Sequence, residues 1–165
     1  MFKFCYRHSR DLPAMTSLLI VYHTQSGSCA ALARAAAKGA RQEADAEVVV
    51  RRACDAGIDD LAVADGLLLV AAENSGSLSG GCKDFLDRIF YPAIDQALVL
   101  PYALLLSAGN DGRGALQQAE RILRGIPLTP ALEAQICRGE VGHQHLLVAS
   151  EMGLGLAAGL GMGIF

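Results

Sequence analysis

The sequence lacks the features that mark several large classes of protein. No apolar run in its 165 residues reaches the roughly 18–20 residues of a membrane span. Its five cysteines are odd in number and form no C-x-x-C pair, which argues against a disulfide framework or a zinc ribbon and favours a reducing compartment. The formal net charge of −3 lacks the basic excess of a nucleic-acid-binding domain. We therefore expect a cytoplasmic protein without a membrane span or a nucleic-acid partner.

Residues 1–15 differ in composition from the rest of the chain. The apolar stretch of a secretory signal peptide is missing from them. Their basic side chains outnumber the acidic one, with Lys3, Arg7 and Arg10 against Asp11. Two interpretations are open, a basic arm or an upstream start before a domain that begins at Met15. The second is favoured, so we expect an extension that is not native to the domain of residues 16–165.

From residue 17 onward, short apolar runs alternate with segments of helical periodicity. Continuously apolar runs are typical of strands that are buried on both faces of a parallel sheet. The runs cover residues 18–22, 48–50, 66–72 and 102–106, with a weaker fifth strand in 132–137. The helical segments cover residues 28–43, 82–91, 115–124 and 144–159, with a short one in 58–64. Pro92 is expected to end the segment 82–91.

Five β–α units in one chain of this length predict a single α/β domain, a three-layer doubly wound fold with a five-stranded parallel sheet. Five strands favour the strand order 2-1-3-4-5 over the six-stranded dinucleotide fold. Ligands of such sheets bind beyond the carboxyl ends of the strands. Gly155 and Gly159 are expected to let the last helix approach a neighbour closely.

The loop after the first strand joins hydroxyl groups to the start of a helix. It consists of Thr24, Gln25, Ser26, Gly27, Ser28 and Cys29. A helix N-terminus offers N–H donors to an anion, and the absence of Lys removes the loop pattern of triphosphate-binding proteins. Two interpretations are open: a site for a phosphate monoester, or a helix whose cap is Ser26 or Ser28.

The loops after the third and fourth strands consist mostly of small and polar residues. The third-strand loop contains Asn74, Ser75, Gly76, Ser77, Leu78, Ser79 and Gly80, and the fourth-strand loop contains Gly109, Asn110, Asp111 and Gly112. Exposed amides with little side-chain bulk suit a flat ring that needs hydrogen bonds along its edge. Each loop alone is equally well explained as an ordinary connection. Because parallel strands end at one edge of the sheet, the three loops together predict one binding site.

Two of these segments resemble the flavodoxin-like family. Residues 23–33, HTQSGSCAALA, look like the FMN phosphate loop of that family. Residues 73–90, ENSGSLSGGCKDFLDRIF, are similar to the segment after the third strand in NAD(P)H-dependent FMN and quinone reductases of the Trp-repressor-binding-protein type. The resemblance extends over residues 17–165. It implies a flavodoxin-like fold, with the FMN phosphate on Thr24, Ser26 and Gly27 and the other two loops along the ring.

The resemblance also implies a function. We expect an FMN-dependent oxidoreductase, with NAD(P)H as the candidate electron donor and a small-molecule acceptor such as a quinone or free flavin. Two alternatives are open: a non-enzymatic electron carrier, and an interaction protein with a weak or vestigial FMN site. The chain has no Trp, and the three loops carry no aromatic residue to stack on the ring, which leaves room for a substrate.

Several residues have a structural as well as a functional interpretation. Cys29 stands where the family has Thr, and a thiol is a weak donor. Its pKa could be lowered at a helix N-terminus, although a packing role is favoured.

The histidines are not assigned a chemical role. His23 is expected to be structural, and no catalytic residue is identified. His143 and His145 should point apart near a helix start, so no metal site is expected. The sequence leaves open whether the chain forms a homo-oligomer.

Overall fold

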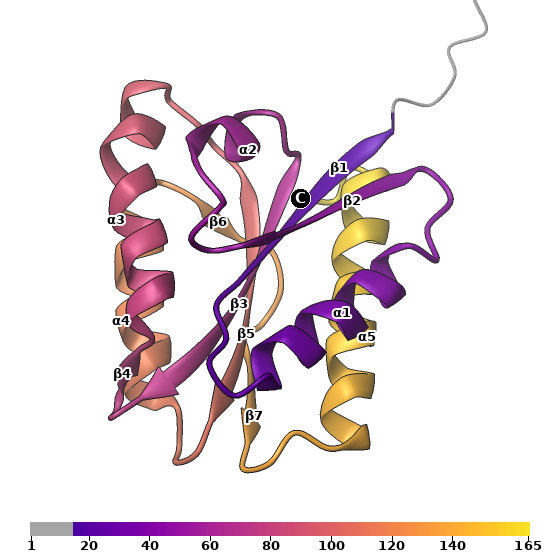
Figure 1. The fold of residues 1–165 in the computed structure, drawn as a ribbon. Helices are drawn as coiled ribbons and strands as arrows, with labels where there is room; N and C mark the ends of the chain where they lie inside the picture. The colour runs from indigo at the N-terminus through magenta and orange to yellow at the C-terminus, as the bar shows by residue number, and fades with distance from the viewer. Residues whose placement is uncertain (1–14) are drawn as a thin grey trace, which may run out of the picture.

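The computed structural model describes residues 15–165, so the expected amino-terminal extension, apart from its last residue, lies outside the described part of the chain. Figure 1 shows one twisted sheet between two layers of helices. The long strands are β1 (Thr16–Tyr22), β2 (Ala46–Arg52), β3 (Gly66–Asn74), β5 (Pro101–Ala108) and β7 (Gln135–Arg138). The helices are α1 (Ser28–Ala40), α2 (Ile58–Ala62), α3 (Gly80–Asp95), α4 (Arg113–Gly125) and α5 (His143–Gly161).

The long strands are parallel and follow the order β2-β1-β3-β5, with β7 paired to the outer side of β5. Counted among the long strands alone, this is 2-1-3-4-5, so the predicted doubly wound α/β fold is confirmed. Two short strands extend this sheet. The first, β4 (Ser77–Leu78), is antiparallel to β3, and the second, β6 (Thr129–Pro130), is parallel to β5.

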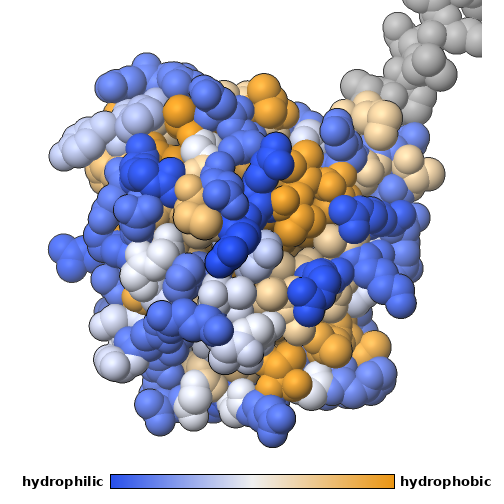
Figure 2. Space-filling view, viewed as in Figure 1, coloured by the Kyte–Doolittle hydropathy of each residue, from blue (hydrophilic) through white to orange (hydrophobic). Residues whose placement is uncertain are grey.

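Both faces of the central strands are buried. In β1, Leu18 and Ile20 pack beneath α1 and α5, whereas Leu19 and Val21 pack on the opposite face beneath α3 and α4. Alternate side chains of a strand point to opposite faces, so a strand with two buried faces is apolar at every position. The edge strand β2 is only half-buried, and Figure 2 shows hydrophobic side chains there between hydrophilic ones. None of the helices in residues 15–165 combines the length and hydrophobicity that crossing a bilayer requires.

The expectation that Pro92 ends its helix is wrong, because α3 continues to Asp95. Proline lacks the N–H that would bond to the carbonyl of Arg88, four residues earlier. The loss falls near the end of the helix, where Ala93 is still fully buried and the Gln96 N–H bonds to the Pro92 carbonyl. Packing of the last turn therefore outweighs one missing hydrogen bond.

The fifth strand begins later than the sequence indicates. Instead of residues 132–137, β7 covers Gln135–Arg138. Pro130 pairs with Tyr102 and Gln135 pairs with Leu105, so five steps along the outer chain match three steps along β5. Residues 131–134 between these two pairs belong to no strand, so only the second half of the predicted segment pairs with β5.

Helices α1 and α5 lie against each other on one face of the sheet (Figure 1). A Cβ atom at Gly39 would overlap the backbone carbonyl of Ser150, and one at Gly153 would overlap the carbonyl of Ala36. Two glycines, one from each helix, therefore permit this close approach.

The glycines that the sequence assigned to this role are different ones. A Cβ at Gly155 would meet no atom of the described residues within 4 Å, and the residue is exposed. Gly159 packs against the ring of Phe165 rather than against another helix. The expectation for Gly155 and Gly159 is therefore wrong, because helical periodicity alone does not tell which glycine faces the partner helix.

Gly153→Ala is expected to lower the free energy of unfolding by about 1–3 kcal/mol, because the new methyl group must displace backbone of α1. Gly155→Ala lies in the same helix and should raise it by up to about 1 kcal/mol through the better helix propensity of alanine. Urea unfolding of the two variants measures both effects. Equal stabilities would contradict the close contact at Gly153.

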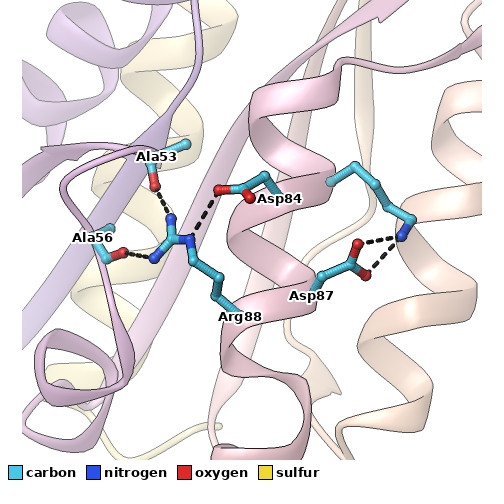
Figure 3. Close-up of polar contacts among 6 residues, drawn as sticks. Ala53, Ala56, Asp84, Asp87 and Arg88 are labelled. Carbon is cyan, nitrogen blue, oxygen red and sulfur yellow. Dashed lines mark hydrogen bonds and ion pairs between the residues drawn. The ribbon is translucent and has the colours of Figure 1, made fainter.

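On the other face of the sheet, Arg88 connects α3 to the loop after β2 (Figure 3). Its guanidinium donates to the carbonyl oxygens of Ala53 at 2.5 Å and Ala56 at 2.8 Å. Its Nε donates to Asp84 on the preceding turn at 2.9 Å. The planar guanidinium thus satisfies two partly buried carbonyls and one carboxylate at once.

Arg88→Ala is expected to lower the free energy of unfolding by about 2–3 kcal/mol, because two partly buried carbonyls lose a charged donor. Lys83→Ala removes the neighbouring exposed pair with Asp87, whose oxygens lie 2.6 Å from Nζ, and should cost no more than about 1 kcal/mol. Thermal and denaturant unfolding compare the two variants. A larger loss in the Lys83 variant would overturn this assignment.

Candidate functional site

A cavity of about 290 Å³ lies at the carboxyl ends of the parallel strands. Its wall combines the loop after β1 with the ends of β3 and β5 and the residue after β7. The lining residues are His23, Thr24, Gln25, Ser26, Ser28, Cys29, Ala72, Glu73, Asn74, Ser107, Ala108, Gly109 and Gly139. The strand order reverses between β1 and β3, and the cavity lies at this switch point, where doubly wound sheets bind ligands.

The start of α1 forms one side of the cavity and carries free N–H groups. Gly27 is the N-cap and adopts a left-handed conformation with φ of 96°, and no side chain in residues 15–165 caps the helix. The first bond of the helix runs from the Ala31 N–H to the Gly27 carbonyl, so the N–H groups before it have no partner within the helix. The interpretation of Ser26 or Ser28 as a simple cap is therefore wrong.

The hydroxyl groups of this loop organise it from within. The Thr24 Oγ1 accepts the Gly27 N–H at 3.0 Å, which fixes the turn and leaves the hydroxyl proton of Thr24 available. The Ser26 and Ser28 hydroxyls lie 3.2 Å apart, so one donates to the other. Hydroxyls and helix N–H groups thus gather where an anion is favoured by the helix dipole.

The loop after β3 is a tight hairpin and lies mostly outside the cavity wall. Ser75 and Gly76 both have positive φ, as the two central residues of a type I′ turn require. The Leu78 N–H donates to Gln118 of α4 at 2.9 Å, which holds the hairpin against that helix. Asn74 alone of this predicted loop lines the cavity, and its Nδ2 donates to the Gln25 Oε1 at 3.2 Å.

The loop after β5 contributes backbone rather than side chains to the cavity wall. Gly109 lines the cavity, and the Asn110 N–H donates to the Glu73 Oε2 at 3.2 Å. Asp111 turns back to accept the Arg113 N–H at 3.0 Å, and Gly112 is the N-cap of α4. Residues 110–112 therefore shape the start of α4 and lie outside the cavity wall.

The structure brings together seven of the predicted site residues, namely Thr24, Gln25, Ser26, Ser28, Cys29, Asn74 and Gly109. Gly27 forms the turn beside them, and residues 75–80 and 110–112 do not line the cavity. The lining residues that the sequence did not assign to the site are His23, Ala72, Glu73, Ser107, Ala108 and Gly139. Glu73 and Ala108 directly adjoin the predicted loops, and Ser107 precedes Ala108, so their position near the ends of β3 and β5 was the available signal. Gly139 could not be predicted as a cavity residue, because the sequence did not show that β7 ends at Arg138.

His23 has a packing contact as well as a place in the cavity wall. A Cβ at Gly81 would overlap its ring, so the ring lies against the first turn of α3. Its Nδ1 is buried and has no hydrogen-bond partner among the described residues. His143 and His145 lie far along the chain at the start of α5, where the Gly142 N–H donates to the Nδ1 of His145 at 3.4 Å.

Cys29 is 1% exposed, at the start of α1. Burial raises the pKa of its thiol to about 12, and the nearby Cys82 and Cys137 add to the rise, while a backbone hydrogen bond at Ser107 opposes it. The loss of hydration on burial therefore raises the pKa of this thiol by more than the helix dipole can lower it. The suggestion of a lowered pKa is wrong, and the favoured packing role is confirmed.

Cys29 is expected to resist alkylation by iodoacetamide in the folded protein at about pH 8, because the thiolate is the reactive form and is scarce far below the pKa. Cys54 is exposed and serves as the internal control, which should react. Peptide mass spectrometry measures the two rates in one sample. Labelling of Cys29 at the rate of Cys54 would contradict the burial argument.

Comparisons with known proteins extend the description of the fold. No protein-family model matches the chain, and no curated protein sequence matches it. Solved structures do match. A flavodoxin from the domain Archaea superposes with a TM-score of 0.78 at 18% identity, covering 88% of this chain and 99% of that one. A flavodoxin, WrbA-like protein from Agrobacterium tumefaciens gives 0.73 at 18% identity, covering 88% and 97%.

A third match is part of a larger protein. The Flv1 flavodiiron core from Synechocystis sp. PCC6803 superposes with a TM-score of 0.77 at 16% identity, covering 91% of this chain and 37% of that one. The chain thus spans about a third of that protein and nearly all of the two flavodoxins. Together these similarities show a flavodoxin-like fold.

Proposed function

We propose that this protein binds FMN in the cavity at the carboxyl ends of the strands. The observation that carries the proposal is the uncapped start of α1, which lines the cavity with Ser28 and Cys29 beside Thr24 and Ser26. A phosphate monoester fits this donor set, because helix N–H groups and hydroxyls can hold its charge without a cationic side chain. Similarity in fold to flavodoxins supports the proposal.

The remaining cavity wall suits a flat ring. Ala72 in β3, Ala108 at the end of β5 and Gly109 directly after it carry at most a methyl group, so a ring can approach the backbone there. None of the lining residues is Phe, Tyr or Trp, and His23 is the single residue of the cavity wall with a ring side chain. An open ring face gives a second reactant access to the cofactor.

We therefore infer an oxidoreductase that takes electrons from NAD(P)H and passes them to a small-molecule acceptor such as a quinone or free flavin. FMN supplies the redox chemistry when bound, and this chain binds and orients it. The full-length match to an archaeal flavodoxin favours a second candidate, an electron carrier without NAD(P)H activity. Steady-state oxidation of NADPH and NADH with a quinone separates the two, because only the enzyme turns over.

Titration of the apoprotein with FMN, FAD and ATP tests the ligand. FMN should bind most tightly, because the loop offers monoester-sized donors and none of its residues is a lysine that could meet a triphosphate. FAD or ATP binding as tight as FMN would overturn the proposal. Absence of FMN binding would leave the alternative of a vestigial site.

Ser26→Ala is expected to weaken FMN binding by about 1.5–3 kcal/mol, because a hydrogen bond to a charged phosphate is lost. Thr129→Ala removes a hydroxyl from an exposed position at the opposite end of the sheet and should leave the affinity unchanged. Fluorescence titration of the two folded variants provides the comparison. Full affinity in the Ser26 variant would show that the phosphate lies elsewhere.

A further inference from the structure

Two grooves at the amino ends of the parallel strands lie at the opposite end of the sheet from the cavity. Large hydrophobic side chains are exposed there. Met15 is 62% exposed and immediately precedes Thr16, which lines the first groove. Four more line the grooves with exposures of 70%, 67%, 64% and 42%, namely Val99, Met162, Ile164 and Phe165. A gathering of exposed apolar side chains indicates an interaction surface.

The first groove, which we call the acidic groove, has a volume of about 320 Å³ and lies between the starts of β1 and β2 and the end of α5. Figure 1 shows the end of α5 next to the start of β1. Glu43 and Asp45 line this groove, and neither belongs to any of the ion pairs formed within residues 15–165. Arg41, two residues before Glu43, donates instead to the carbonyl of Val48 at 3.4 Å. The acidic groove therefore suits a cationic occupant.

The second groove, which we call the apolar groove, has a volume of about 410 Å³, and none of its lining residues is charged. It lies between β6, the start of β5 and the last residues of the chain. The Ile164 N–H donates to the carbonyl of Gly159 at 2.9 Å, which holds these last residues against α5. Residues 162–165 join the two grooves, because Met162 lines the acidic groove and Ile164 lines the apolar groove.

We propose that residues 1–14 of this chain dock across these two grooves, with basic side chains at the acidic groove and aromatic side chains in the apolar groove. A basic arm is one of the two interpretations that the sequence leaves open for this segment. Arg7 and Arg10 are the closer residues to the start of β1 along the chain, and Phe2 and Phe4 are the more distant ones. The grooves follow the same order, because the acidic groove includes the start of β1 and the apolar groove lies beyond it.

Reach and charge favour this occupant over a second copy of the chain. Phe4 precedes Met15 by eleven residues, which span up to about 36 Å when extended and can therefore cross both grooves. A second copy related by a two-fold axis would bring Glu43 and Asp45 of both chains to one interface, where like charges repel. A segment of the same chain meets its docking site at an effective concentration on the order of millimolar, so weak contacts suffice.

Disulfide trapping in the full-length protein tests the proposal, because Cys5 belongs to the docking segment. Val99→Cys and, separately, Ile164→Cys place a thiol at the apolar groove. Leu147→Cys is a matched control, at an exposed position near the start of α5 and outside both grooves. Cys54→Ser in every protein removes an exposed native thiol. A buffer of reduced and oxidised glutathione measures the effective concentration of Cys5 at each position, and intact-mass spectrometry separates bonds within one chain from bonds between two.

The effective concentration of Cys5 should be at least about tenfold higher at positions 99 and 164 than at position 147, with the bond formed within one chain. Glu43→Gln combined with Asp45→Asn should lower the value at position 99 by about twofold to fivefold, because exposed ion pairs are weak. Glu140→Gln removes an exposed carboxylate outside both grooves and should leave the value unchanged.

Three results would each overturn the proposal. The first is an equal effective concentration at positions 99, 164 and 147. The second is a set of disulfides that form mainly between two chains, which would assign the surface to a second copy. The third is an unchanged value at position 99 when Glu43 and Asp45 are both neutralised.

Discussion

The central strands β1, β3 and β5 are buried on both faces, and this constraint shapes the rest of the molecule. A strand without an exposed face needs cover on two sides, which the crossover helices of parallel β–α units supply. Parallel strands then all end at one edge of the sheet, and the helices that follow begin there. The positive end of α1 therefore lies beside the ends of β3 and β5 as a consequence of how the core is buried.

Packing also fixes the direction of α1, on which the proposed phosphate site depends. Cys29 and Leu32 anchor its first turns in the core with exposures of 1% and 0%, and Gly39 lets its last turn touch α5. A helix held at both ends cannot rotate to satisfy its first N–H groups elsewhere. These groups stay free at the cavity because the interior, rather than the loop, determines where the helix points.

The fold could be predicted because buried strands leave a continuous apolar pattern, as in residues 18–22 and 66–72. The place of residues 24–29 in the cavity wall could also be predicted from the sequence, since this loop follows a buried strand and precedes a helix. The hairpin at Ser75 and Gly76 was not, because a stretch of small polar residues is compatible with a ring-binding loop and with a type I′ turn. Side-chain contacts between distant segments, such as that of Glu73 with Asn110, leave no local pattern.

The phosphate is the part of the ligand that the start of α1 is proposed to hold, and riboflavin is FMN without it. Isothermal titration calorimetry with both molecules therefore tests most directly whether this site binds the cofactor. FMN should bind at least about tenfold more tightly than riboflavin, since each charge-assisted hydrogen bond contributes about 1.5–3 kcal/mol. Equal affinities for FMN and riboflavin would contradict the assignment of the phosphate to the free N–H groups of α1.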